Sequence, residues 1–315
     1  MYRARFFPVA PCMSRIEGRG RPEDAGEARS GERGSVRRAQ LEDEQHEPRG
    51  VPPEAAAKAE SQHHPSVGVS YAVIDRAGVE ELKRGNAALA WSGLAAGLSM
   101  GFSFLCQALL AAHLPPADWA PLISRLGYSI GFLVVILGTQ QLYTENTLTA
   151  VLPVLARRQA SMLRNMLRLW AIVLLANLVG ALLFALVLQV PGLFSFDIER
   201  ELDRLAAEAM RHSWSVKLML AIFAGWLIAL MVWMLPAAET LGTVVIIIIT
   251  YFVALGGFPH VIAGGVEAFH YGLGGGGLGR ALGGYILPAL IGNTIGGVAL
   301  VAGLAHAQVV GSGDG

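Results

Sequence analysis

Three titratable side chains, Glu145, His260 and Glu267, lie within long apolar stretches of the sequence. An ionisable residue at the centre of a membrane-spanning helix costs about 2.5–3.5 kcal/mol on insertion scales, so such residues usually serve a solute pathway. Imidazole titrates near neutral pH, so His260 can donate a hydrogen bond to an anion and exchange a proton. The alternative for His260 is a buried histidine that only bonds the backbone.

The two carboxylates fit an anion pathway less simply. Two like charges 4–6 Å apart repel by about 3–4 kcal/mol at an effective dielectric near 20, so a charged Glu145 would oppose an anion. We therefore expect Glu145 to be paired with a cation or turned toward the cytoplasmic mouth, with protonation as the remaining alternative. Glu267 lies two turns beyond His260, so it projects either toward the lumen or toward a neighbouring subunit.

These residues belong to two apolar stretches that are interrupted near their middle. In the first, an apolar run ends at Leu137, and seven polar side chains fill residues 139–147. In the second, the run ends at Gly256-Gly257, and Pro259 suits the first position of a second half-helix. Irregular backbone at membrane depth is tolerated only inside protein or along a water-filled cavity. Ordinary Pro/Gly kinks are the alternative.

Six stretches approach or exceed the roughly 20 apolar residues that a membrane span requires. They cover residues 87–112, 123–155, 167–190, 217–235, 241–271 and 285–308. The two interrupted stretches are the middle members of two triplets, a pattern typical of transporters built from inverted repeats with the site between the breaks. The sequence thus predicts an all-α membrane protein with six transmembrane helices, of which helices 2 and 5 are broken.

The remaining segments suggest four parts. Residues 1–66, rich in Arg, Glu, Gly and Pro, are predicted to be a disordered, charged cytoplasmic tail, and Met13 is a candidate start. Residues 67–85 are predicted to form an amphipathic helix on the membrane surface, the alternative being an extension of the first span. Residues 86–309 form the six-span transporter domain, and residues 310–315 a short C-terminal tail.

The distribution of basic residues predicts orientation. The N-terminal segment and the 157–168 loop hold most of the Lys and Arg, so both are expected in the cytoplasm, with the C-terminus there too after an even number of spans. Residues 192–213 mix apolar and charged residues and are expected to form a surface helix outside. Gly93, Gly97 and Gly101 repeat every four residues, as in close helix packing in lipid.

Composition narrows the class of protein. The chain is 53% hydrophobic and only 15% charged, against about 25% charged in soluble domains, and its formal net charge of zero gives no reason to expect a nucleic-acid partner. Two cysteines, Cys12 and Cys106, predict no disulfide framework or metal site, and no cofactor is expected. No HExxH or paired-Asp motif occurs, so we expect no enzyme. A structural or signalling membrane protein remains the alternative to a transporter.

Several strings carry a resemblance to a known family. They are AWSGLAAGLSMG, QQLYTENTLTAVLPVL, GWLIALMVWMLPAA, ALGGFPHVIAGGVE and LPALIGNTIGGVALVAGLAHAQ. Over about residues 71–308, the chain resembles the formate/nitrite transporter family and, within it, a YfdC-like inner-membrane subgroup. The resemblance implies an aquaporin-like protomer with its own pore, a homopentamer in the inner (plasma) membrane, and transport of small monovalent anions of weak acids, with channel and proton-coupled transport both open.

The resemblance also implies roles for particular residues. His260 matches the family's pore histidine, and Thr144 matches its loop threonine on the broken second helix. The other matched or neighbouring pore positions are Leu142 and Tyr143 at the constriction, Phe132 and Tyr128 at the outer slit, and Glu145, Asn146 and Glu267 beside them. We expect a weak-acid anion to be polarised by His260 and Thr144 and to cross the apolar constrictions as the neutral acid or with a proton.

Departures from the family pattern lie around the histidine. Gly225 stands where the family places an asparagine in span 4. Gly264, four residues after the histidine, stands where the family places a second asparagine. Both changes are expected to remove polar partners of the histidine or of pore water. Together with Glu145, they favour as the alternative function a pore of the same fold for a neutral or cationic solute.

Overall fold

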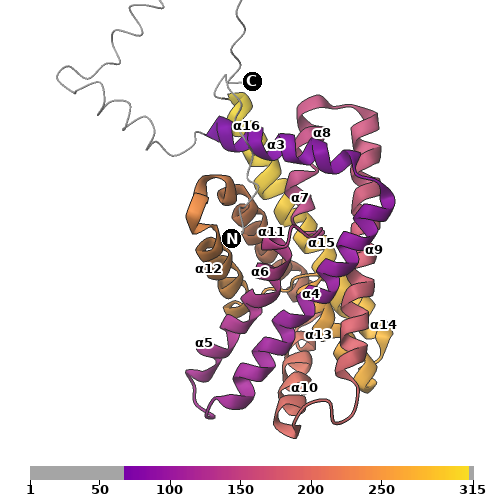
Figure 1. The fold of residues 1–315 in the computed structure, drawn as a ribbon, viewed down its shortest axis with the longest axis vertical. Coiled ribbons are helices and arrows are strands. Elements are labelled where there is room, and N and C mark those ends of the chain that lie inside the picture. The colour runs from indigo at the N-terminus through magenta and orange to yellow at the C-terminus, as the bar shows by residue number, and fades with distance from the viewer. Residues whose placement is uncertain (1–66, 312–315) are drawn as a thin grey trace, which may run out of the picture. The chain divides into compact units, whose positions relative to one another are not determined.

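The computed structural model describes residues 67–311, and the predictions for residues 1–66 and 312–315, including the candidate start at Met13, lie outside this range. The described chain is all-helical (Figure 1). Five helical segments within it are long and apolar enough to cross a membrane: 86–113, 120–137, 160–188, 214–238 and 278–311. The helix at 242–255 is apolar but shorter, because the fifth stretch is interrupted as the sequence predicted.

The first triplet begins with α4 (Asn86–His113). The second crossing is built from α5 (Ala120–Ser124), η1 (Arg125–Tyr128) and α6 (Ser129–Leu137), so its first half ends at Leu137 as predicted. After a non-helical segment, the short helices α7 (Asn146–Thr149) and α8 (Leu152–Arg157) complete it, and α9 (Ala160–Leu188) follows.

The second triplet begins with α11 (Trp214–Ala238), followed by η2 (Glu239–Leu241) and α12 (Gly242–Leu255). The second half-helix is α13 (Ala263–Tyr271), so Pro259 lies in the non-helical connection. The prediction that Pro259 begins this helix is therefore wrong, because His260 and not the proline provides the cap described below.

The last crossing starts earlier than predicted. It follows η3 (Gly272–Gly276) and runs through α14 (Leu278–Ala281), η4 (Leu282–Ile286), α15 (Leu287–Ile295), η5 (Gly296–Gly303) and α16 (Leu304–Gly311). The glycine-rich segment before Tyr285, expected to be a connection, is thus mainly helical, and η3, η4 and η5 are wide π-type turns. Such turns usually occur as single interruptions of α-helices.

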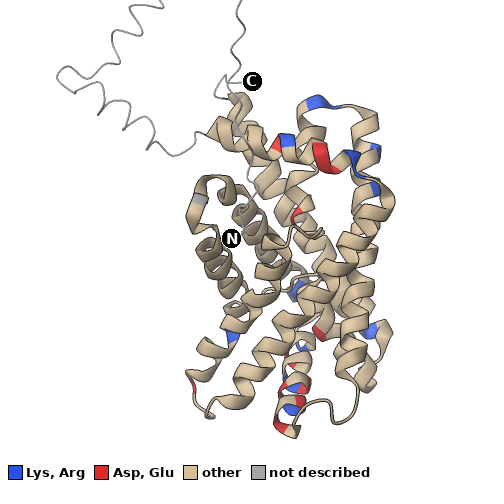
Figure 2. Ribbon diagram, viewed as in Figure 1, with Lys and Arg blue, Asp and Glu red and all other residues tan. Residues whose placement is uncertain are grey.

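Two further helices lie at opposite ends of the bundle (Figure 1). Helix α3 (Val67–Lys83) ends before α4 begins, and its Asp75 forms a two-pronged ion pair with Arg157, both distances 2.7 Å. Helix α10 (Phe196–Met210) buries Ile198, Leu202 and Leu205 against α4 and α13. It therefore packs on the protein rather than lying free on a surface. Figure 2 shows most charged residues at these two ends, with few between them.

Small residues bring the long helices into close contact, as their spacing predicted. A Cβ at Gly97 of α4 would collide with the backbone of Asn177 on α9. A Cβ at Gly225 of α11 would collide in the same way with the backbone of Asn293 on α15. Each triplet therefore has one glycine seam that joins its first and third helices, which is how helices associate closely in lipid.

Candidate pore site at the two helix breaks

The two interrupted crossings break in the same way. At the end of α6, the Thr139 N–H bonds the Ile136 carbonyl and the Gln140 N–H bonds the Val135 carbonyl, at 3.1 and 2.9 Å. At the end of α12, Gly257 and Phe258 repeat both bonds at 3.1 Å each. This pair of bonds is the Schellman motif, whose C′ residue has positive φ. Thr139 has φ 52° and Gly257 has φ 59°.

Two buried asparagines hold the breaks in place. The Asn177 side chain accepts from the Tyr143 N–H at 2.9 Å and donates to the carbonyls of Gly93 and Gln141 at 2.7 and 2.9 Å. It thereby joins α9 to both the first break and α4. Backbone groups freed by a broken helix need such partners at membrane depth.

Asn293 makes the same three contacts in the second triplet. Its side chain accepts from the Val261 N–H at 2.8 Å and donates to the carbonyls of Ala221 and Pro259 at 2.8 and 2.9 Å. It joins α15 to the second break and to α11. By these contacts, Leu142 in the first break occupies the place that His260 occupies in the second.

His260 and Thr144 meet where the two breaks face each other. The Thr144 hydroxyl lies 2.8 Å from His260 Nε2, and both residues are buried. His260 Nδ1 accepts from the N–H groups of Ile262 and Ala263 at 3.3 and 3.1 Å, so the ring caps the first turn of α13. Since Nδ1 is an acceptor, the neutral ring carries its proton on Nε2 and donates it to Thr144.

Apolar side chains close the space around this contact. The Phe132 ring meets the His260 ring edge-on, with centroids 5.1 Å apart, and the Tyr128 ring follows at 5.3 Å from Phe132. Phe132 and Leu142 have no exposed surface. His260 itself has no exposed surface, so the contact with Thr144 is closed to solvent in this structure.

The residues next to Thr144 point elsewhere. The Tyr143 hydroxyl hydrogen-bonds the Thr294 hydroxyl at 2.9 Å, and its ring packs on Trp170. The Asn146 amide donates to Gln141 Oε1 at 3.0 Å, and Gln141 in turn donates to Glu81 of α3 at 2.9 Å. Tyr143 therefore ties the first break to α15 and α9, Asn146 ties it through Gln141 to α3, and no described hydrogen bond joins either side chain to His260.

Glu145 has no counter-ion in the described part of the chain. Its Oε1 atom is buried without a hydrogen-bond partner, and none of the ion pairs between residues 67 and 311 includes it. Of the two arrangements favoured from the sequence, pairing with a cation is not found within this range, and the turn toward the cytoplasmic mouth stays a prediction. An unpartnered carboxyl oxygen is unfavourable in a buried position, which leaves protonation or movement toward the α3 side as the means of relieving it.

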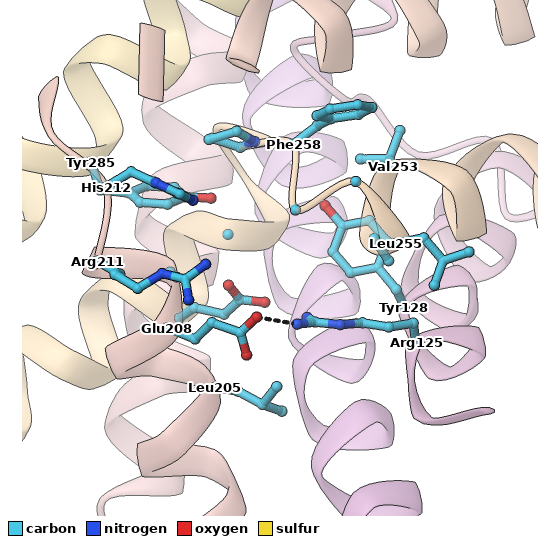
Figure 3. A pocket seen from close by; sticks show the side chains of 17 residues that line it. Arg125, Tyr128, Leu205, Glu208, Arg211, His212, Val253, Leu255, Phe258 and Tyr285 are labelled. Carbon is cyan, nitrogen blue, oxygen red and sulfur yellow. Dashed lines mark hydrogen bonds and ion pairs between the residues drawn. The ribbon is translucent and has the colours of Figure 1, made fainter. Parts of the chain in front are cut away.

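Glu267 lines a cavity of its own chain, and its projection toward the pore lumen or a neighbouring subunit stays a prediction. This cavity, of about 180 Å³, lies between α10, the end of α12 and the start of the second crossing, and 17 residues line it (Figure 3). Arg125, Tyr128, Glu208 and Tyr285 are among them. We call this cavity the vestibule.

The two glycine departures have a structural explanation. A Cβ at Gly264 would overlap the Tyr285 hydroxyl, so Tyr285 brings a polar group to the place that an asparagine would fill. Gly225 lies at the seam with Asn293, where there is no room for an asparagine side chain. The expected loss of polar partners around the histidine is therefore offset at one of the two positions.

Sequence reasoning missed four residues that the structure brings to the site. Arg125 lies near the start of the second apolar stretch, and Asn177 and Asn293 are polar residues near the middle of largely apolar spans, so a search for such residues would have found them. Tyr285 gave no signal, because a tyrosine near the start of a span is typical of the membrane interface.

Comparisons with known proteins agree with this geometry. A family model described as "Formate/nitrite transporter" matches residues 69–307. The inner membrane protein YfdC of Escherichia coli K12 is 38% identical over 237 residues, which cover 75% of this chain and 76% of that protein. The formate channel FocA of Haemophilus influenzae is 29% identical over 180 residues, covering 55% of this chain and 62% of that protein.

Solved structures show the same fold. An FNT family ion channel superposes with a TM-score of 0.67 at 20% identity, covering 76% of this chain and 98% of that one. A pentameric formate channel with formate bound superposes with a TM-score of 0.56 at 19% identity, covering 75% and 98%. The predicted resemblance is confirmed, and the protein is a multi-pass membrane protein and not an enzyme. The chain belongs to the formate/nitrite transporter family.

Proposed function

We propose that the chain forms a transmembrane pore for small monovalent anions of weak acids. The observation that carries this proposal is the Thr144–His260 contact of 2.8 Å at the meeting point of two broken helices. Inverted repeats with breaks in matching spans place their substrate sites there. An anion that reaches the contact would replace the Thr144 hydroxyl as the acceptor of the His260 Nε2–H.

The apolar residues around the contact define the rest of the path. Phe132 and Leu142, both fully buried, are the constrictions that a charged species crosses least readily. A weak acid can pass such a barrier as the neutral species after taking up a proton. Tyr128 and Glu267 belong to the vestibule before Phe132, while Tyr143, Glu145 and Asn146 shape the opposite side.

The central test is flux through the purified full chain in proteoliposomes. We expect His260→Ala to lower formate or nitrite flux strongly, because removal of one preorganised donor usually costs about 10²–10³-fold. The control is His113→Ala, since His113 is exposed at the end of α4. Unchanged flux in His260→Ala would overturn the proposal. Single-channel recording beside pH-dependent flux separates a channel from a proton-coupled transporter.

A second candidate is a pore of this fold for a neutral or cationic solute. It is favoured by the buried, unpartnered oxygen of Glu145 and by the second acid Glu267 beside the vestibule. A flux panel of formate, nitrite, hydrosulfide, acetate, ammonium and potassium distinguishes the two. Ammonium or potassium flux that exceeds anion flux and falls in Glu145→Gln supports the second candidate.

Assembly and orientation are part of the proposal. Large apolar side chains remain exposed along α9, among them Leu175, Val179, Leu183 and Val187, and we propose that lipid and neighbouring copies in a homopentamer cover such faces. We also propose that both termini are cytoplasmic in an inner (plasma) membrane. The described ends, α3 and α16, lie at one end of the bundle, where the Tyr71 hydroxyl meets His306 at 2.8 Å. Native mass spectrometry and terminal reporter fusions test the two points.

A further inference from the structure

The vestibule under α10 contains a preorganised guanidinium. Arg125 of η1 donates to Gln107 Oε1 at 3.2 Å and to Glu208 Oε1 at 2.6 Å. Gln107 is fully buried and also donates to the Ser103 carbonyl, so the contact with Gln107 fixes one side of the guanidinium. The other side points into the cavity, where Glu208 meets it (Figure 3).

Glu208 is a carboxylate that can leave this position. Its side chain is 35% exposed, and its second oxygen lies 3.2 Å from Arg204 on the outer surface of α10. Arg204 therefore provides an alternative partner if Glu208 releases Arg125. The Arg125 side chain is only 18% exposed, so it cannot follow into solvent. Leaving a buried charge without a partner is costly, so when Glu208 leaves, either an incoming anion or Glu267, the other acid of the cavity lining, must balance Arg125.

The rest of the cavity suits a small anion. Arg211 lines it as a further positive charge beside the acid Glu267, and Figure 3 shows Arg211 and Arg125 pointing from opposite sides toward Glu208. The remaining wall includes apolar residues of the α12 end, Val253 and Leu255, and Phe258. The cavity volume of about 180 Å³ is several times the roughly 30 Å³ that one molecule occupies in liquid water, so a small anion fits.

We propose that Arg125 is a docking site for a small planar anion with two terminal oxygens, such as a short monocarboxylate, and that the Glu208 carboxylate occupies the site until the anion displaces it. The guanidinium fork matches such an anion in a two-pronged geometry, which a spherical ion cannot use. The role of this site as a pore entrance rests on the proposed function. Anion binding to the site can nevertheless be measured without transport.

The test is calorimetric titration of the detergent-purified full chain with acetate and formate at constant ionic strength, with chloride as the comparison ion. Glu208→Gln should bind acetate at least about threefold more tightly because the internal competitor is weakened, and Arg125→Gln should bind it at least about tenfold more weakly. The double variant should match Arg125→Gln. Asp197→Asn is the matched control, since Asp197 pairs with Arg200 at 3.2 Å on α10 and does not line the cavity.

Several results would overturn the proposal. Acetate binding that is unchanged or weaker in Glu208→Gln, or additive effects in the double variant, would make the ion pair a structural fastening of α10. Chloride binding as tight as acetate binding would remove the two-oxygen preference. If Arg125→Gln does not fold, Arg125→Lys replaces it, and acetate affinity equal to the natural chain's would contradict the need for a fork.

The same titrations in His260→Ala separate this site from the pore. Normal acetate binding with normal flux in that variant would refute the role of His260 and leave the docking site intact. Normal binding with lost flux supports both proposals. Lost binding in His260→Ala would show that the measured site is the pore contact and not Arg125, which refutes the docking site.

Discussion

The two triplets of this protein share a backbone arrangement but differ in the side chains that they present. Both broken helices end in a Schellman motif, and both breaks are held by an asparagine on the third helix of the triplet. At equivalent places, however, the first break has Leu142 and the second has His260. The repeated parts satisfy backbone groups, whereas the parts that differ meet at the centre of the protein.

This difference separates residues that satisfy the backbone from residues that we propose to line the pore. The asparagine amide in each half bonds only backbone groups, so its role does not depend on which solute passes. The proposed pore needs one donor and apolar surroundings, and in the proposal the second half supplies His260 while the first supplies Thr144 and Leu142. Substitutions at matching positions of the two halves, compared by their effects on stability and flux, test this division.

The largest effect is expected at the asparagines. Asn177→Ala and Asn293→Ala should each lower the free energy of unfolding by about 2 kcal/mol or more, because each leaves three buried backbone groups without their partner. Thermal unfolding of detergent-purified protein measures the effect, with Asn165→Ala on α9 as the control. A large loss in one variant and none in the other would show that the two clamps are not equivalent.

The next effect concerns the residue pair at the centre of the breaks. His260→Leu gives the second break the residue that the first break has, and flux should fall about 10²-fold because the Nε2–H donor is lost. His260→Asn is the matched variant, since asparagine is a good helix cap and can still accept from the first turn of α13. Because the asparagine amide also has N–H donors, full flux in His260→Asn would show that a donor other than imidazole suffices, whereas full flux in a folded His260→Leu protein would contradict the donor role.

Thr144→Val should have a smaller effect. The substitution removes the hydroxyl that accepts the His260 proton but keeps the shape, so flux should fall about threefold to tenfold, in line with a hydrogen bond worth roughly 1 kcal/mol. Thr147→Val is the control, because the Thr147 hydroxyl bonds only the Thr144 carbonyl in the described structure. Equal loss of flux in both variants would assign the effect to the loop's conformation and not to the histidine.

Sequence could predict the breaks because their causes are local. A run of polar residues after Leu137 and the Gly256-Gly257 pair both end an apolar helix, and both ends were placed correctly. The start of α13 was misplaced because its cap comes from the His260 ring bonding two N–H groups, a contact that no spacing rule describes. The last span was predicted to start at residue 285, although helix begins at Leu278. Glycine has a low helix propensity, so a glycine-rich segment is predicted to be a connection unless its tertiary packing is known.

The candidate site was predictable where a residue type was unusual for its surroundings. His260 and Thr144 stand out among apolar residues, and the structure brings them together. The vestibule was not predictable, because Arg125 and Glu208 lie far apart in the sequence and meet only when α10 packs on α4 and α13. The absence of a partner for Glu145 was equally hidden, since pairing depends on distances that sequence does not give.

The smallest predicted effect compares the left-handed residues of the two Schellman motifs. Gly257 adopts φ 59° without strain, whereas Thr139 adopts φ 52° with a β-branched side chain, for which this region costs about 1–2 kcal/mol. Gly257→Ala should therefore destabilise the protein by about 1 kcal/mol. Thr139→Gly should stabilise it by less, because glycine also gains roughly 0.5–1 kcal/mol of freedom in the unfolded chain.

The melting temperatures of the two variants in detergent measure this pair of changes. No atom lies within 4 Å of a Cβ built at Gly257, so Gly257→Ala tests backbone strain and not steric overlap. Opposite shifts of the two variants would show that the motifs are equivalent and that threonine is retained against a local cost. A drop in stability in Thr139→Gly would mean that the Thr139 side chain stabilises the first break. The second break, which has Gly257 at this place, lacks such a contribution.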